Sequence, residues 1–483
     1  MQQNSQYDAV VVGAGPNGLS AAITLAKAGC SVLLVEAKDT VGGGCRSAEL
    51  TLPGFIHDPC ATIHSLGVTS PFFQSLPLSE FGLEWIYPPA ALVHPLDDKK
   101  AVVLERSVDK TSNNLGEDGA AYKRLIGPFV ANWKKLTSEI LGPLRIPPRH
   151  PWILARFGYY AIRSAQSLAT SQFKGVRGRA LFAGLGGHSI QPLDQVATAA
   201  FGLVLGTSGH VTGWPVARGG SQSLSDALAD YFRALGGKIV TSSPVESFDD
   251  FPSARVVLFD VTPRQLITIV GDRMPPVYRR RLEGFRYGHG VFKVDYAIDG
   301  AIPWRATECM QAATAHLGGT LEEIASAEKA ISRGEHPEKP FVLLAQQSLF
   351  DPTRVPNGKH TVWAYCHVPN GSNFDMTERI EAQIERFAPG FRNRVLARNT
   401  RSPNELQEYN ANYIGGDING GVQDWRQLFT RPIARWVPYS TPMKGIYICS
   451  SSTPPGGGVH GMCGYHAAQA ALKGLGKPPV RLL

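Results

Sequence analysis

Apolar residues near the start of the chain form two short continuous runs separated by an amphipathic stretch. The runs, residues 9–12 and 32–35, are unbroken rather than alternating, which is typical of parallel strands buried on both faces. Between them, small and apolar side chains recur at helical spacing over residues 17–28, and Gly29 follows at the position of a C-terminal cap. The pattern therefore predicts a strand–helix–strand unit.

The turn after the first run has the spacing G-x-G-x-x-G, the fingerprint of a dinucleotide-binding turn. We expect Gly13 to make the tight turn, Gly15 to let the backbone approach a pyrophosphate, and Gly18 to let the helix lie close to the strand. The helix N-terminus then offers free N–H groups to phosphate. Glu36 ends the second run at the distance where a carboxylate accepts hydrogen bonds from an adenosine ribose. Its charge disfavours a 2′-phosphate on that ribose.

The rest of the chain shows further helix and strand patterns but no second nucleotide fingerprint. Helices are expected over residues 224–235 and 376–387. Strands are expected at residues 238–240, 256–259, 290–298, 341–344, 361–366 and 445–449. The strand at 290–298 alternates, and a lysine on such a strand, here Lys293, is more often exposed than buried. With one fingerprint, a built-in NAD(P)H domain is not expected.

A second glycine cluster, at residues 42–44, makes a family resemblance specific. Glu36 followed by this cluster resembles the flavoprotein pattern shared by phytoene desaturases and flavin amine oxidases. Residues 52–58 and 60–64 extend the similarity to the phytoene-dehydrogenase-like subgroup of that superfamily. The resemblance implies FAD as the cofactor. Those families place Arg directly after the glycine pair, whereas this chain has Gly44 there and Arg46 two residues on.

The C-terminal motif, residues 456–462, is similar to the closing motif of the same superfamily, where a glycine turn feeds a helix that faces the flavin pyrimidine. A helix N-terminus stabilises the negative charge of a reduced flavin. The resemblance implies FAD contacts by Gly13, Gly15, Gly18, Glu36, Gly43, Arg46, Val245, Gly458, Val459, Gly461 and Met462.

Two side chains are candidates for a catalytic role through the same resemblance. Lys293 falls on the amine-oxidase lysine that reaches a water at flavin N5, and His460 lies in the flavin-facing turn. His64, at the end of the segment 60–64, is a further residue that could approach the flavin. A hydrogen-bonded structural histidine is the favoured interpretation.

The expected fold is α/β, with a Rossmann-like FAD-binding domain built from discontinuous segments and an inserted α+β substrate domain. The expected segments of the FAD-binding domain are residues 1–85, 216–285 and 431–483, and those of the substrate domain are residues 86–215 and 286–430.

Composition narrows the protein class. The chain of 483 residues is 43% hydrophobic and 18% charged, as in ordinary globular proteins. Its seven cysteines are odd in number and lack a C-x-x-C pair, so neither a disulfide framework nor a metal site is expected. The polar residues before the first strand leave no room for a signal peptide, and no apolar run reaches the length of a spanning helix. We expect a cytoplasmic protein.

The net charge of +8 is unevenly distributed. Residues 140–193 contain no Asp or Glu but carry seven bases interleaved with Trp, Tyr and Phe: Arg145, Arg149, Arg156, Arg163, Lys174, Arg177 and Arg179. This mixture suits peripheral contact with an anionic membrane surface. A solvated helical face is the equally weighted alternative. No nucleic-acid motif accompanies the bases, so nucleic acid is not an expected partner.

The resemblance implies an FAD-dependent oxidoreductase that dehydrogenates or desaturates an apolar isoprenoid or lipid-like substrate by hydride transfer to flavin N5. Electrons are expected to leave by oxygen, quinone or another acceptor. Two alternatives stay open: a flavin amine oxidase, and a non-catalytic FAD-containing scaffold or chaperone. Amine oxidases of this superfamily flank the flavin with two aromatic side chains. Here Tyr439 or Trp436 falls near one wall, but the other falls on Gly461, which cannot form a wall.

Overall fold

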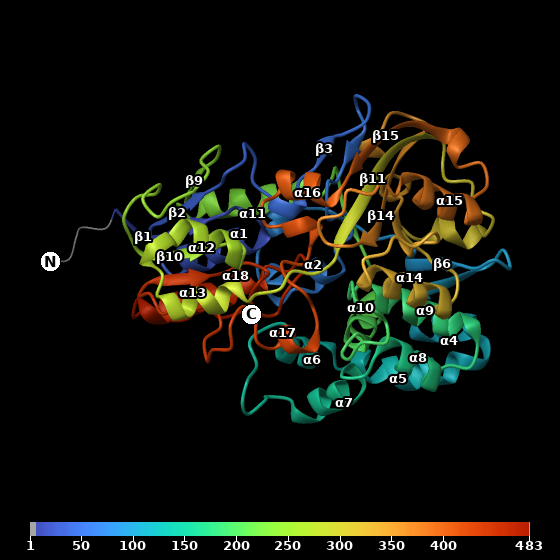
Figure 1. Ribbon diagram of the computed structural model, residues 1–483, viewed down its shortest axis with the longest axis horizontal. Coiled ribbons are helices and arrows are strands. Elements are labelled where there is room, and N and C mark those ends of the chain that lie inside the picture. Colours follow the sequence, from blue (N-terminus) through green and yellow to red (C-terminus); the bar gives the residue numbers. More distant parts are fainter. Residues whose placement is uncertain (1–5, 483) are drawn as a thin grey trace.

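The computed structural model describes residues 6–482 and has two halves, each built on a large sheet (Figure 1). The first sheet is entirely parallel and has the strand order β16-β10-β1-β2-β9. Its strands are β1 (Tyr7–Val12), β2 (Val32–Val35), β9 (Lys238–Val240), β10 (Ala254–Phe259) and β16 (Ile446–Ile448). They come from three distant parts of the sequence, so the sheet is assembled from discontinuous segments.

Helices cover both faces of this sheet, which explains why its strands are continuously apolar. One face packs against α1 (Pro16–Lys27), α11 (Gln222–Ala234) and α18 (Met462–Gly474). The other packs against α12 (Pro263–Val270) and α13 (Pro276–Glu283). In Figure 1 all five helices surround the sheet in the same half of the molecule. The predicted strand–helix–strand unit and the Rossmann-like fold class are confirmed.

The second sheet has seven strands in the order β15-β11-β14-β13-β12-β6-β7. Its pairs are antiparallel except for β12 with β6. Its strands are β6 (Ala90–Pro95), β7 (Ala101–Glu105), β11 (Gly290–Asp299), β12 (Thr314–Leu317), β13 (Val342–Ala345), β14 (Lys359–Val368) and β15 (Val395–Arg401). The sheet packs against α14 (Leu321–Ser332) and α15 (Thr377–Phe387), which makes this half α+β.

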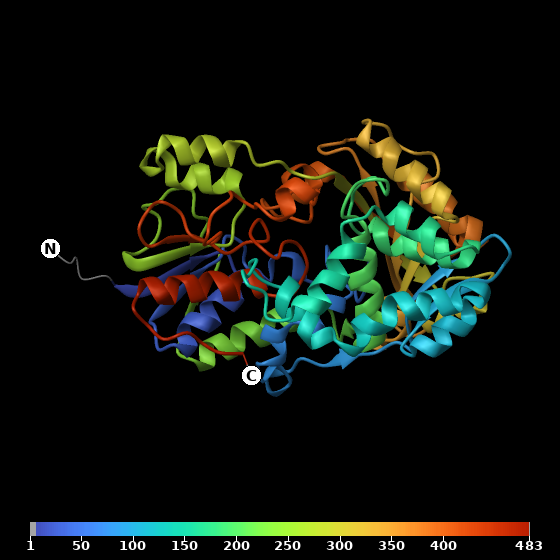
Figure 2. The same cartoon turned by 90° about the horizontal axis from the view of Figure 1, so that it is seen from below.

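The helices of residues 108–211 form a separate layer, which lies in front of the second sheet in Figure 2 and is coloured cyan to green. They are α4 (Val108–Asn114), α5 (Gly119–Ala131), α6 (Trp133–Ile140), α7 (Pro151–Ala161), α8 (Ala165–Gln172), α9 (Val176–Gly187) and α10 (Ala199–Val211). Their apolar faces share one core with β6, β7, β13 and β14. Shorter elements include α2 (Ser65–Thr69), α3 (Pro71–Gln74), α16 (Pro403–Tyr409) and α17 (Trp425–Leu428). Among residues 6–482, no helix has the length and apolar character needed to cross a membrane.

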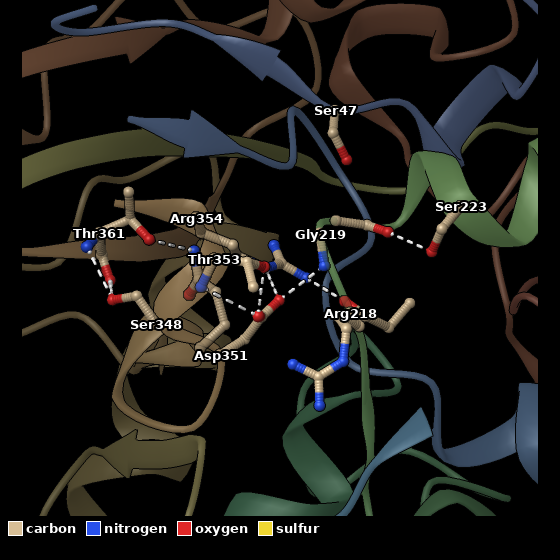
Figure 3. A network of polar contacts seen from close by, with 12 residues as sticks. Ser47, Arg218, Gly219, Ser223, Ser348, Asp351, Thr353, Arg354 and Thr361 are labelled. Carbon is tan, nitrogen blue, oxygen red and sulfur yellow. Dashed lines mark hydrogen bonds and ion pairs between the residues drawn. The ribbon is translucent and has the colours of Figure 1, made fainter. Parts of the chain in front are cut away.

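A fully buried arginine joins three distant segments at the junction of the halves. Arg354 donates through Nη1 to Asp58 at 2.6 Å, through Nε to Asp351 at 2.9 Å, and through Nη2 to the carbonyl of Ala217 at 2.7 Å. Asp351 also accepts the Gly219 N–H at 2.7 Å, as Figure 3 shows. The glycine turn at residues 218–221 therefore anchors the first sheet's helix α11 to the second half.

Candidate active site

A cavity of about 1110 Å³ is lined from both halves of the molecule. One part of its wall is the glycine-rich loop after β1, together with the end of β2 and residues 43–46. Apolar residues of α7, α10, β13 and β14 form another part, and residues from 409–438 and 451–460 complete the wall. The arrangement connects the glycine-rich loop directly to a largely apolar chamber, the kind of concave site in which proteins bind small molecules.

The glycines of the fingerprint have the geometry that their spacing predicts. Gly13 has a φ of +99°, which favours glycine, and lines the cavity with Gly15. A Cβ on Gly43 would lie 3.0 Å from Gly15 Cα, so two glycines face each other across a narrow cradle. A Cβ on Gly18 would lie 1.8 Å from the Gly13 carbonyl oxygen. Gly18 therefore allows close packing behind the cradle, as expected.

Glu36 and Arg46 are brought together at the end of β2. Glu36 Oε2 accepts the N–H of Ala14 at 2.7 Å, and its Oε1 accepts Arg46 Nη2 at 3.0 Å. Arg46 also donates through Nε and Nη2 to the Thr40 carbonyl at 3.1 and 3.0 Å. Both residues line the cavity, as does Val245 after β9. The guanidinium predicted to meet phosphate is thus paired with the carboxylate predicted to meet ribose.

Asp260 is a site residue that the sequence analysis missed. It directly follows β10, is buried against the glycine loop, and lines the cavity. Its Oδ2 accepts the Gly18 N–H at 2.9 Å. A polar residue at the carboxyl end of a parallel strand was the available signal, because ligands of such sheets bind at that edge.

The C-terminal motif divides into residues on the cavity wall and residues behind it. Gly458, Val459 and His460 line the cavity. Gly461 is packed against α1 and α3 instead: a Cβ there would lie 2.1 Å from Ser20 Oγ. The Met462 N–H donates to His460 Nδ1 at 3.1 Å. Gly461 and Met462 therefore shape the start of α18 from behind the wall, because close helix packing excludes them from its surface.

Lys293 is buried, contrary to the exposure expected for a lysine on an alternating strand. Its strand β11 lies between β14 and β15 and is buried along nearly its whole length. The ammonium pairs with Asp295, and Nζ lies 5.4 Å from the centroid of the Trp363 ring. Trp363 lines the cavity, whereas Lys293 lies in the layer behind it.

Two histidines on the cavity wall are held by hydrogen bonds. His64 Nε2 lies 2.9 Å from Ser221 Oγ, which agrees with the expected structural role. His460 Nδ1 accepts from Met462, so the proton of its neutral ring is on Nε2. Burial lowers the pKa of both imidazoles to about 4. Both are neutral near pH 7.

A second pair of histidines, also missed from the sequence, lies at the end of the cavity formed by the second sheet. His188, after α9, lines the cavity, and its Nε2 lies 2.9 Å from Nε2 of buried His316 on β12. A Cβ on Gly184 would lie 2.7 Å from His316 Nδ1, so glycine is needed beside the pair. The two residues are 128 positions apart, and their sequence context carries no pattern that predicts the contact.

The aromatic residues considered for an amine cage lie apart. Tyr439 is buried, and its hydroxyl donates to the Pro454 carbonyl at 2.9 Å. Trp436 lines the cavity but is 96% exposed, which places it at the mouth. With Gly461 behind the wall, these three positions do not form a facing pair of aromatic walls.

Exposed apolar side chains surround the mouth of the cavity, and we call this set the rim: Leu144, Ile146, Ile162, Val196, Trp425, Phe429 and Trp436. Trp152 and Tyr159 on α7 are also exposed, although neither lines the cavity. Of the seven bases in residues 140–193, Arg156, Arg163, Arg177 and Arg179 donate hydrogen bonds to protein oxygens. Arg149 and Arg156 are exposed.

Among residues 6–482, all seven cysteines are free, and no group of three or more His, Cys, Asp or Glu is arranged to hold a metal ion.

Comparison with known proteins places residues 11–76 in the family model described as an NAD(P)-binding Rossmann-like domain. The chain is 25% identical to pyridine nucleotide-disulfide oxidoreductase domain-containing protein 2 of Rattus norvegicus, over 97% of this chain and 94% of that protein. It is 29% identical to one of the subunits of limonene dehydrogenase from Castellaniella defragrans, over 30% of this chain and 26% of that one.

The fold is also found in solved structures. Wild-type putrescine oxidase bound to putrescine matches with a TM-score of 0.61 and 19% identity, over 97% of this chain and 99% of that chain. A likeness at this identity establishes the shared fold, with its Rossmann-like sheet and second sheet-based half.

Proposed function

We propose that the protein is an FAD-dependent oxidoreductase that dehydrogenates an apolar, isoprenoid-like or lipid-like small molecule. The observation that carries the proposal is the single cavity that joins the glycine cradle to an apolar chamber. The similarity to limonene dehydrogenase supports this substrate class, because the name of that enzyme specifies a terpene hydrocarbon.

The residues present fit FAD. The cradle between Gly15 and Gly43 is a space that a single Cβ would fill, and it leads to the N-terminus of α1, where N–H groups favour phosphate. Glu36 and Val245 both line the cavity, where the Glu36 carboxylate would meet the ribose and Val245 the adenine. Bound FAD would supply a two-electron acceptor for a hydride from substrate.

The chain's own contribution is binding, orientation and exclusion of water. Leu343, Trp363 and Tyr365 give the chamber an apolar wall that would hold a hydrocarbon and keep water out. The neutral His460 ring fixes the turn at the start of α18. Electrons taken from the substrate would finally be transferred to oxygen, a quinone or another acceptor.

The first prediction concerns the cofactor. The purified protein should be yellow and hold one non-covalent FAD per chain, measured by absorbance after denaturation. Gly15→Leu should abolish FAD binding, because its side chain would fill the cradle beside Gly43. Gly127→Leu on α5 is the control, since a Cβ there meets nothing within 4 Å. A colourless wild type that cannot be reconstituted with FAD would contradict the proposal.

The substrate class is tested by anaerobic stopped-flow screening of flavin reduction. Isoprenoid hydrocarbons and lipids should bleach the flavin, and primary amines should not. Rapid bleaching by amines would favour the amine-oxidase alternative. That alternative is tested because the chain shares the fold of putrescine oxidase. Against it stands the absence, among Trp436, Tyr439 and Gly461, of two facing aromatic walls. A protein that holds FAD but is bleached by neither class would be a flavin-containing scaffold.

We also propose that the rim docks on an anionic membrane surface. An apolar substrate partitions into the bilayer. The rim presents exposed Trp436, and the segment that supplies part of the rim also carries exposed Trp152, Arg149 and Arg156. Aromatic rings lie at headgroup depth, and bases are attracted to lipid phosphate. Docking would place the cavity mouth against the phase that dissolves the substrate.

A further inference from the structure

Asp260 is a carboxyl group placed where an anion is expected to bind. Its Oδ2 accepts the N–H of Gly18 at 2.9 Å and would lie 3.0 Å from a Cβ on Gly15. Gly15 forms the cradle with Gly43, where the proposed function places the pyrophosphate, and Gly18 packs directly behind it. Asp260 is only 7% exposed, so water offers an ionised carboxylate little screening there.

The neighbours of Asp260 do not neutralise it. Within residues 6–482, no Lys, Arg or His forms an ion pair with Asp260. Arg46, a cation on the same wall, is hydrogen-bonded to Glu36 and to the Thr40 carbonyl. The backbone N–H of Asp260 donates to the Val12 carbonyl, and the Asp260 carbonyl accepts from Asn412 Nδ2 at 3.0 Å. These bonds fix the residue in place.

We propose that Asp260 contacts the cofactor's pyrophosphate as a neutral carboxylic acid that donates a hydrogen bond, so that FAD binding takes up a proton. The inference rests on the proposed function. It adds Asp260 as a contact of the cofactor and the uptake of one proton on binding. An ionised Asp260 would repel the diphosphate across the cradle, whereas the protonated form can keep the Gly18 N–H on one oxygen and donate from the carboxyl O–H.

The titration properties of the site agree with this geometry. Burial raises the pKa of Asp260 to about 7, Glu36 adds to the rise, and the Gly18 N–H opposes it. The other titratable groups that face Asp260 are Cys449 after β16 and Cys463 on α18. Burial raises the pKa of both thiols, to about 12 for Cys463, so they stay neutral over the range tested below.

The direction of the pH effect follows from linkage. Below pH 7 the carboxyl group is protonated and the diphosphate meets a donor. Above pH 7, binding must first restore the proton, so the dissociation constant for FAD rises up to tenfold per pH unit. His64 and His460, with pKa values of about 4, are neutral throughout and do not contribute.

The experiment titrates flavin-free protein with FAD from pH 6 to 8.5 by fluorescence quenching. For the wild type we expect the dissociation constant to rise about thirtyfold over this range. Calorimetry at pH 8 in buffers of different ionisation enthalpy should show uptake of close to one proton per FAD. Asp260→Asn, whose amide can donate at any pH, should bind with little pH dependence, and more tightly than the wild type at pH 8.5.

A wild-type dissociation constant that does not change with pH, or calorimetry without proton uptake, would overturn the proposal. So would an Asp260→Asn variant with the wild-type pH dependence. The calorimetric result on the wild type decides the matter if the variant does not fold. Failure of the proposed function is distinguishable, because FAD would then not bind at any pH.

Discussion

At the scale of single residues, Lys293 shows how an unfavourable position is made stable. A buried ammonium is costly, and burial lowers the pKa of Lys293, but Asp295 on the same strand supplies the opposite charge. His57 Nδ1 lies 3.7 Å from Asp295 Oδ1, within the same buried group. Removing one partner of such a pair costs about 3–5 kcal/mol, since the other is left uncompensated.

Lys293→Met is predicted to slow reoxidation of the reduced flavin by oxygen while FAD stays bound, because the family resemblance implies that this lysine acts at flavin N5 through a water, which assists oxygen attack. The double variant Lys293→Met/Asp295→Asn separates this effect from instability. It should recover much of the lost free energy of unfolding and yet reoxidise as slowly as the single variant. Stopped-flow reoxidation and urea unfolding measure the two effects. Wild-type reoxidation in both variants would leave Lys293 a purely structural role.

The same residues show what the sequence could and could not predict about the site. The spacing predicts the turn at Gly13 and the close packing at Gly18, and the structure has both, whereas the pyrophosphate contact of Gly15 stays a prediction. Lys293 was expected to be exposed because β11 alternates, but two neighbouring strands and packed layers bury both of its faces. Asp260 and the His188–His316 pair acquire their surroundings only when distant segments meet.

At the scale of elements, the crossing of α1 and α18 controls the shape of the site. A Cβ on Gly464 would lie 1.8 Å from the carbonyl oxygen of Asn17, so the two backbones are in direct contact. Gly461 and Gly464 thus set how closely the C-terminal turn approaches the glycine loop. The sequence predicted both helices, but their closeness depends on a tertiary contact.

Gly464→Ala is predicted to destabilise the protein by at least about 1–3 kcal/mol, because backbone atoms cannot move aside as a flexible side chain would. The displaced turn should also weaken FAD binding. Gly158→Ala on α7 is the matched control, since a Cβ there meets nothing within 4 Å. It should be neutral or stabilising by up to about 1 kcal/mol, through helix propensity. Urea unfolding and FAD titration compare the variants, and equal stability of the two would contradict the packing argument.

At the scale of the whole molecule, the two halves meet at the cavity and the rim opens at one side. The rim is built from residues 144–196 and 425–436, and Figure 1 shows α7 and α17 below the two sheets. From the sequence alone, the acid-free segment fitted a membrane surface and a solvated helical face equally well. In the structure, Arg156, Arg163, Arg177 and Arg179 donate to protein oxygens, and of these Arg156 is still exposed.

Liposome co-sedimentation should increase with the fraction of anionic lipid and decrease with salt, because the Debye length shrinks to about 8 Å at physiological ionic strength. Each base near the surface contributes about 1 kcal/mol. Arg149→Glu/Arg156→Glu should therefore lower membrane partitioning by at least about thirtyfold while FAD stays bound. The control is Lys99→Glu/Lys100→Glu in the exposed turn between β6 and β7, which changes net charge equally but does not line the cavity. Equal losses in both variants would indicate non-specific attraction.

The order of strands in the first sheet also has a consequence for synthesis on the ribosome. β1 and the glycine loop leave the ribosome early, but β1 pairs with β10, and β10 pairs with the last strand, β16. The helix that closes the site, α18 (Met462–Gly474), follows β16 and is made later still. A nascent chain therefore carries a complete fingerprint long before it has a complete site. Under the proposed function, cofactor loading is expected only after the synthesis of α18, and a chain that stops before it would carry the motif without this part of the site.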